Sequence, residues 1–144
     1  MRTTTLSTSE NLGATLLRLA LGAMFLAHAG LKIFTFGMTG TIEFFASVGL
    51  PAWSAYGVVT AETTGGVMLI LGMHTRVVSL ALFPVLIGAA SVHWGNGWVF
   101  TAPNGGWEYP IFLAVASVVQ ALLGDGAYAL RWQAPEERSP LPNS

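Results

Sequence analysis

The feature that most constrains the fold is a set of apolar segments, each long enough to cross a bilayer. A transmembrane helix needs about 20 mostly apolar residues to span a hydrocarbon core of about 30 Å. Four segments approach or exceed this length, at residues 12–34, 53–73, 77–94 and 109–128. Each must be a helix, because lipid offers the backbone no hydrogen-bond partners. The sequence therefore predicts an all-α integral membrane protein with a bundle of four transmembrane helices.

The composition agrees with a membrane chain and excludes several classes of function. Of 144 residues, 53% are hydrophobic and only 9% are charged, against about 25% charged in an ordinary soluble domain. Six basic residues and a net charge of −1 provide no surface for nucleic acid, so the expected partner is the lipid bilayer. The absence of cysteine excludes disulfides, thiol redox chemistry and thiolate metal ligands.

One membrane domain is expected over residues 12–130, between an N-terminal tail (1–11) and a C-terminal tail (131–144). The short connection "HTR" at residues 74–76 predicts an antiparallel hairpin between the second and third segments.

The two longer connections also have predicted structure. Residues 35–52 contain "TIEFFASVGLP", which predicts a short amphipathic helix at the membrane interface, ended by Pro51. Residues 95–107, "GNGWVFTAPNGGW", predict an ordered cap at an aromatic belt.

The basic residues outside the apolar segments indicate the orientation. Arg2, Arg76, Arg131 and Arg138 fall on one side of the predicted bundle, whereas Lys32 borders the other side. By the positive-inside rule, we expect both termini in the cytoplasm and the two long connections outside.

Titratable side chains within or beside the apolar segments are the candidates for function. From the helical rise, His28 and Lys32 lie near the outer end of the first segment, with His93 and Glu108 at the same level on two other segments. Four polar groups at one depth would be costly unless they contact one another or a ligand. We therefore predict an outer-leaflet pocket in which His28, His93 and Glu108 exchange protons. Lys32 would hold an anionic or carbonyl oxygen of the ligand.

The predicted pocket has a roof and an inward extension. Trp94 and Trp107 lie in the tryptophan-rich connection that would cover it. Glu62 lies deep in the second segment, and Arg18 is the expected ion-pair partner that would continue the site inward. The same residues also have structural interpretations, because a buried ion pair can serve only to fix helix register. Lys32 can similarly snorkel, and Glu108 can cap a helix.

The two histidines also raise the question of a metal or haem site. A HxxxH spacing within one helix is absent, and we predict no metal site. Lys32 beside His28 favours an anionic or quinone-like head group over a cation.

Six stretches, in order along the chain, resemble the DoxX-like family of small four-span bacterial membrane proteins. They are "LRLALGAMFLAHAGLKIF", "GLPAW", "AETTGGVMLILGMHTR", "SVHWGNGW", "GGWEYP" and "LLGDGAYAL", and together they cover about residues 12–130. The motif residues of the family map onto Arg18, His28, Lys32, Glu62, Gly66, Arg76, His93, Glu108 and Asp125. "GDGAYAL" departs from the serine-leucine-aspartate step usual in the family, so the resemblance assigns no role to Asp125.

The resemblance implies redox work at the bacterial cytoplasmic (inner) membrane. Relatives include the large membrane subunit of a thiosulfate:quinone oxidoreductase, proteins attached to methylamine oxidation, and a membrane partner of thiol and superoxide defence enzymes. Together with the predicted pocket, it implies a quinone-linked oxidoreductase subunit that binds a quinone or a small anion. The sequence shows no electron carrier, so a partner redox protein or a bound cofactor is expected.

Two other functions stay open at this point. One is a small-molecule or proton-coupled carrier, which with four spans would be expected to form a homodimer. A continuous polar path from Glu62 to Arg76 would favour it. The other is a structural membrane scaffold for a partner enzyme, in which the polar groups only lock the bundle.

Overall fold

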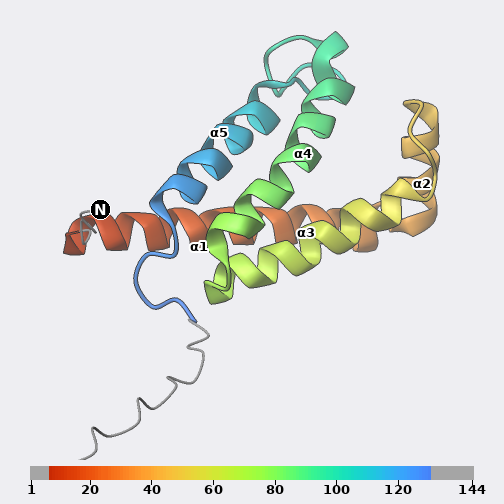
Figure 1. Cartoon of the computed structure of the whole chain (residues 1–144). Coiled ribbons are helices and arrows are strands. Elements are labelled where there is room, and N and C mark those ends of the chain that lie inside the picture. The colour runs from red at the N-terminus through yellow and green to blue at the C-terminus, as the bar shows by residue number, and fades with distance from the viewer. Residues whose placement is uncertain (1–6, 131–144) are drawn as a thin grey trace, which may run out of the picture.

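The computed structural model describes residues 7–130, and over that range the chain is all-helical, as predicted (Figure 1). The helices are α1 (Thr8–Gly30), continued by a π-helical turn (Leu31–Thr35), α2 (Gly37–Ser47), α3 (Ser54–Leu71), α4 (Thr75–His93), followed by a 3₁₀ turn (Trp94–Asn96), and α5 (Glu108–Leu123). Residues 1–6 and the predicted C-terminal tail, with Arg2, Arg131 and Arg138, lie outside the described residues.

Two helices within residues 7–130 are long and apolar enough to cross a membrane. They are the continuous helix Thr8–Thr35 and the helix Thr75–Asn96, whereas α5 is apolar but shorter. The second and fourth predicted segments coincide with α3 and α5. Helix α5 ends at Leu123, short of the predicted residue 128, because Gly124 and Gly126 adopt left-handed φ angles of 86° and 69°.

Two glycines set the register between α1 and α3, which run antiparallel beside each other (Figure 1). A Cβ atom on Gly22 would lie 2.9 Å from the carbonyl oxygen of Gly66, and one on Gly66 would lie 3.0 Å from that of Gly22. Only small residues allow backbones to approach this closely. Residues after Gly22 in α1 therefore lie beside residues before Gly66 in α3.

Helices α4 and α5 form a second closely packed pair, which rises obliquely from α1 and α3 (Figure 1). The predicted hairpin is confirmed, since α3 turns directly into α4 through left-handed Gly72 (φ 75°) and His74 (φ 50°). Arg76 lies in the first turn of α4 and not in the connection. Beyond this turn α3 and α4 diverge (Figure 1). A buried apolar cluster packs inside the bundle, with members that include Leu21, Phe25, Leu69, Leu82, Leu86 and Leu113.

The short helix predicted after the first segment is confirmed as α2, beside the N-terminal end of α3 (Figure 1). It ends at Ser47, before Pro51, because Gly49 adopts a left-handed φ of 80°. Thr41 attaches the helix to α1 through its hydroxyl, which donates to the Lys32 carbonyl oxygen at 2.9 Å. Phe45 on the same face is buried, so α2 forms a wall of the bundle interior.

Candidate functional site

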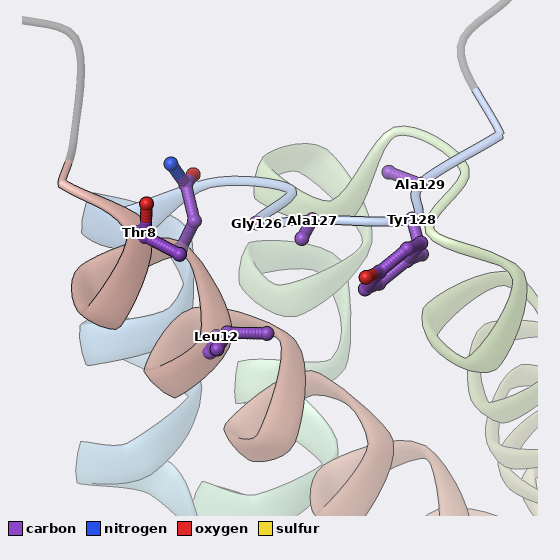
Figure 2. A pocket seen from close by; sticks show the side chains of 7 residues that line it. Thr8, Leu12, Gly126, Ala127, Tyr128 and Ala129 are labelled. Atoms are coloured by element: carbon purple, nitrogen blue, oxygen red, sulfur yellow. The ribbon is translucent and has the colours of Figure 1, made fainter.

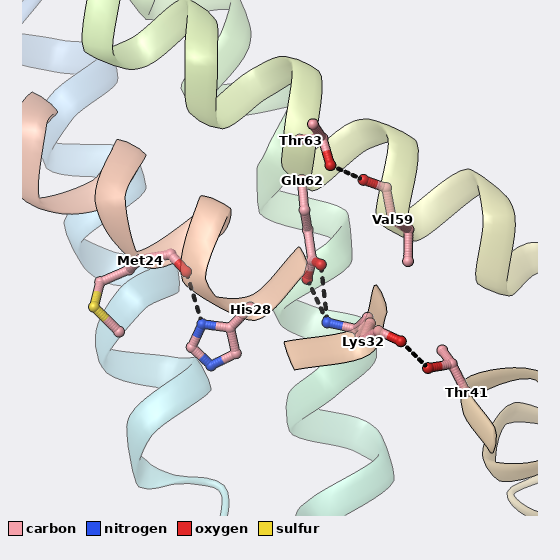
Figure 3. A network of polar contacts seen from close by, with 7 residues as sticks. All are labelled: Met24, His28, Lys32, Thr41, Val59, Glu62 and Thr63. Atoms are coloured by element: carbon pink, nitrogen blue, oxygen red, sulfur yellow. Dashed lines mark hydrogen bonds and ion pairs between the residues drawn. The ribbon is translucent and has the colours of Figure 1, made fainter. Parts of the chain in front are cut away.

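Lys32 and Glu62 form an ion pair between α1 and α3. The Lys32 Nζ donates to both carboxylate oxygens of Glu62, at 2.9 and 2.8 Å (Figure 3). The two side chains are only 19% and 6% exposed, respectively. The backbone at Lys32 is also unusual, because a π-helical turn pairs the Phe36 N–H with the Leu31 carbonyl and Thr41 donates to the Lys32 carbonyl. Single π-helical turns are frequent at functional sites.

The predicted ion pair between Arg18 and Glu62 is wrong, because Glu62 pairs with Lys32. The reason is the register that Gly22 and Gly66 impose on the antiparallel helices. Glu62 precedes Gly66 and therefore lies beside the part of α1 that follows Gly22. Arg18 precedes Gly22 and lies toward the other end of α3.

Arg18 instead packs under the chain segment that follows α5. It is 1% exposed, its Nη2 donates to the Ala127 carbonyl oxygen at 3.4 Å, and its guanidinium contacts the backbone at Gly72. Asp125 is close enough to attract it electrostatically. An open recess of about 450 Å³ lies between this segment and the first turns of α1 (Figure 2). None of the predicted site residues lines this recess, whose walls are Thr8, Asn11, Leu12, Gly126, Ala127, Tyr128 and Ala129.

A larger cavity, of about 620 Å³, lies between the two helix pairs and contains the Lys32–Glu62 pair in its wall. Most of the wall is apolar and partly aromatic, with Phe25, Phe44, Phe45, Phe100 and Tyr109 among its residues. The polar side chains in the wall are those of His28, Lys32, Ser54, Glu62, His93 and Tyr109. Small-molecule sites typically have such a composition and a volume of about 300 to 1,000 Å³. This cavity is therefore the candidate functional site.

His28 is held in the cavity wall by two contacts. Its Nδ1 lies 2.8 Å from the Met24 carbonyl oxygen (Figure 3), and its ring stacks on Tyr109 with centroids 5.9 Å apart. A carbonyl oxygen can only accept a hydrogen bond, so Nδ1 carries the proton and Nε2 of the neutral ring keeps its lone pair. Within residues 7–130, Nε2 has no hydrogen-bond partner. His28 is therefore arranged as a proton acceptor.

His93 also lines the cavity, but it is tied to the cap that follows α4. Its Nδ1 lies 2.9 Å from the Asn104 carbonyl oxygen, and Asn96 donates to the carbonyl oxygens of Asn104 (3.1 Å) and Gly105 (2.8 Å). In the described part of the chain, no three His, Asp or Glu side chains gather closely enough to hold a metal ion. His93 thus combines a place in the wall with a structural role in the cap.

Three tryptophans build the predicted cap over the cavity. Trp107 stacks on Trp94 with centroids 4.5 Å apart and meets Trp98 edge-on, also at 4.5 Å. Neither Trp94 nor Trp107 lines the cavity itself. The segment at Gly105 and Gly106 forms the inner surface of the cap.

Glu108 does not line the cavity, in contrast to His28, Lys32 and His93. Its Oε1 accepts a hydrogen bond from the Phe100 N–H at 2.8 Å, and its own N–H donates to the Trp98 carbonyl at 3.1 Å. Glu108 therefore fastens the cap and positions Phe100, which does line the cavity.

Glu108→Ala is expected to loosen the cap, because a hydrogen bond to a charged acceptor contributes about 1.5 to 3 kcal/mol. Hydrogen exchange of the peptide that contains Phe100, followed by mass spectrometry, should accelerate. Glu108→Gln keeps an acceptor oxygen and should retain most of the protection. Unchanged exchange in the alanine variant would contradict this role for Glu108.

The sequence interpretation missed Tyr109 and the two phenylalanines of α2. Tyr109 follows Glu108 directly, so its depth matches that of His28, but only the rotation of α5 brings its ring into the cavity. Phe44 and Phe45 belong to a helix that was expected only to lie at the membrane interface. The available signal was the pair Phe44–Phe45, because two large aromatic residues in a short amphipathic helix indicate a face that packs against the bundle.

Comparison with known proteins assigns the family. The DoxX family model matches residues 13–94, a range that holds the ion pair, His28 and His93. The chain belongs to the DoxX family. DoxX proteins are membrane-associated, in agreement with the long apolar helices described above. This DoxX chain is 38% identical over 123 residues to a protein of Bacillus subtilis (strain 168) named "Putative oxidoreductase CatD". The aligned residues make up 85% of this chain and 87% of that protein. No solved structure matches the chain significantly.

Proposed function

We propose that this DoxX protein is a membrane component of a redox system and binds a quinone in the 620 Å³ cavity. The family assignment and the relative named as an oxidoreductase support redox work. The observation that carries the proposal is the wall of the cavity, in which a few polar atoms stand among apolar and aromatic side chains.

The Lys32–Glu62 pair favours a quinone over the small anion that the sequence also allowed. A small anion needs a cation whose charge is free, whereas Glu62 neutralises Lys32 at 2.8 Å. A quinone ring is neutral, and its flat faces suit a wall that contains Phe25, Phe45 and Tyr109.

The side chains of the wall fit the polar atoms of such a ligand. When bound, a quinone supplies two-electron, two-proton chemistry at its ring. His28 Nε2 would take up one of the two protons that a reduced ring releases, while Met24 and Tyr109 hold the imidazole in place. Lys32 Nζ donates to a ring oxygen, and Glu62 keeps the ammonium in position. The electrons pass to or from a partner redox protein, which we propose as the functional partner.

For the topology, we propose that α1, α3, α4 and α5 cross the bacterial inner membrane, with α2 at the outer interface and both termini in the cytoplasm. Exposed aromatic side chains support this arrangement, because most of them lie at the helix ends that face the outer side in this topology, where an aromatic belt would lie. They include Phe34, Phe36, Trp53, Tyr56, Trp94 and Trp98. Leu21, Leu69 and Leu82, between Glu62 and the Arg76 end, belong to a buried apolar cluster, which gives no support to the continuous polar path that a carrier would need.

Quinone content tests the proposal. Protein purified in mild detergent should retain extractable quinone, and protein stripped of it should bind added quinone saturably, with quenching of tryptophan fluorescence. Ala89 lines the cavity, whereas Ala81 is exposed on the same helix and does not. Ala89→Phe should therefore abolish binding, and Ala81→Phe should not. The proposal is refuted if the wild-type protein neither retains quinone during purification nor binds added quinone saturably.

A further inference from the structure

We infer that the cavity opens sideways into the bilayer between α2 and α4, and that an apolar tail of the ligand leaves through this opening. The inference rests on the proposed quinone function and specifies the ligand as a lipid-soluble quinone with a tail. It also specifies that the ligand enters the cavity from the membrane and not from water.

The exposure of the lining residues locates the mouth of the cavity. Five of them are exposed, namely Phe44, Leu50, Pro84, Gly88 and Phe100, and all five are apolar. Pro84 and Gly88 come from α4, whereas Phe44 and Leu50 come from α2 and its connection to α3, so the mouth lies between α2 and α4. Pro84 lies about half-way along α4, so in the proposed topology this part of the mouth faces hydrocarbon.

The ion pair and His28 are less exposed than the residues of the mouth. Glu62 is buried, and His28 and Lys32 are only partly exposed. A ligand that spans the cavity therefore meets hydrogen-bonding atoms at one end and an apolar opening at the other. A polar ring with an apolar tail matches this order.

The cap narrows the alternative route from the outer aqueous side, and its Phe100 forms the edge of the mouth. Hydrogen bonds from His93 and Asn96 fix the carbonyls of Asn104 and Gly105, and Glu108 fixes the backbone of Phe100. Gly105 and Gly106 then form cavity wall at this end.

Gly88 makes the mouth testable. A Cβ atom at Gly88 would have no heavy atom within 4 Å, so a larger side chain there extends into open space at the cavity mouth. Gly57 in α3 also has open space around its Cβ position but does not line the cavity. Gly57→Leu is therefore a matched control for Gly88→Leu.

The experiment compares two quinones that share one ring, one with an isoprenoid tail and one without, titrated against protein in lipid nanodiscs. Gly88→Leu should weaken binding of the tailed quinone about tenfold, because the leucine side chain would occupy space at the mouth that the tail needs. Binding of the tail-less quinone should change less than about twofold, and Gly57→Leu should resemble wild type with both. Leu50→Trp, on the opposite side of the mouth, should reproduce the selectivity and replaces Gly88→Leu if that variant does not fold.

Three results would overturn the inference. If wild type binds quinone and the mouth variants bind both quinones normally, the lateral opening is wrong and the proposed function stands. If binding of both quinones weakens equally, Gly88 lies beside the ring, and the tail does not leave through this mouth. If wild type binds neither quinone, the inference and the proposed function both fail.

Discussion

Glu62→Gln is expected to lower the free energy of unfolding of the bundle by about 3 kcal/mol. Removing one partner of a buried ion pair typically costs about 3 to 5 kcal/mol, because the other charge is left uncompensated. We expect the lower end of that range, since Lys32 keeps 19% exposure and part of its hydration. Thermal unfolding in one detergent, followed by near-UV circular dichroism, measures the change.

A matched control and a double variant separate the ion pair from other effects. Glu43 is an exposed carboxylate on α2, so Glu43→Gln should change stability by less than about 0.5 kcal/mol. Replacing the pair together, as Lys32→Met with Glu62→Leu, should recover most of the stability, because well-packed apolar residues substitute for buried pairs without loss. The same double variant should lose quinone binding. A stable Glu62→Gln variant would show that Lys32 finds another partner or reaches water.

The apolar helices, and the gathering of His28, Lys32 and His93 around one cavity, were predictable from the sequence. Each predicted segment corresponds to a helix, and the constant rise per residue placed His28, Lys32 and His93 at one level, where all three line one cavity. Segment length and depth depend only on the local sequence. They need no knowledge of how the helices face one another.

Helix rotation and register were not predictable, and they account for the errors. The pairing of Glu62 with Lys32 in place of Arg18 follows from a backbone contact between Gly22 and Gly66, which hydropathy does not encode. Successive residues on a helix differ in direction by about 100°, so a small rotation decides whether Glu108 or Tyr109 faces the cavity. Glu108 points to the cap, and Tyr109 takes the place in the wall that was assigned to Glu108.

His28→Ala is expected to lower hydroquinone turnover by about 10² to 10⁴-fold, the usual contribution of a positioned proton acceptor. The carbonyl of Met24 fixes the proton on Nδ1, which leaves Nε2 with its lone pair in a cavity wall. Lys32 cannot replace it, because its ammonium is a donor held by Glu62. Turnover is measured in proteoliposomes with hydroquinone and a soluble one-electron acceptor that stands in for the partner redox protein, as the rate above that of protein-free liposomes. Quinone titration measures binding in parallel.

Two further variants distinguish proton transfer at His28 from packing. His28→Gln keeps a polar side chain of similar size but cannot take up a proton, so quinone should bind within about threefold of wild type while turnover falls as in His28→Ala. His74 is exposed at the turn between α3 and α4, far along α3 from Glu62, and His74→Ala should leave both measurements unchanged. If His28→Gln turns over normally, the proton passes elsewhere, and His93 is the other histidine of the wall. If His28→Ala matches wild type in binding and in turnover, the histidine only packs against Tyr109, and a scaffold function explains the bundle better.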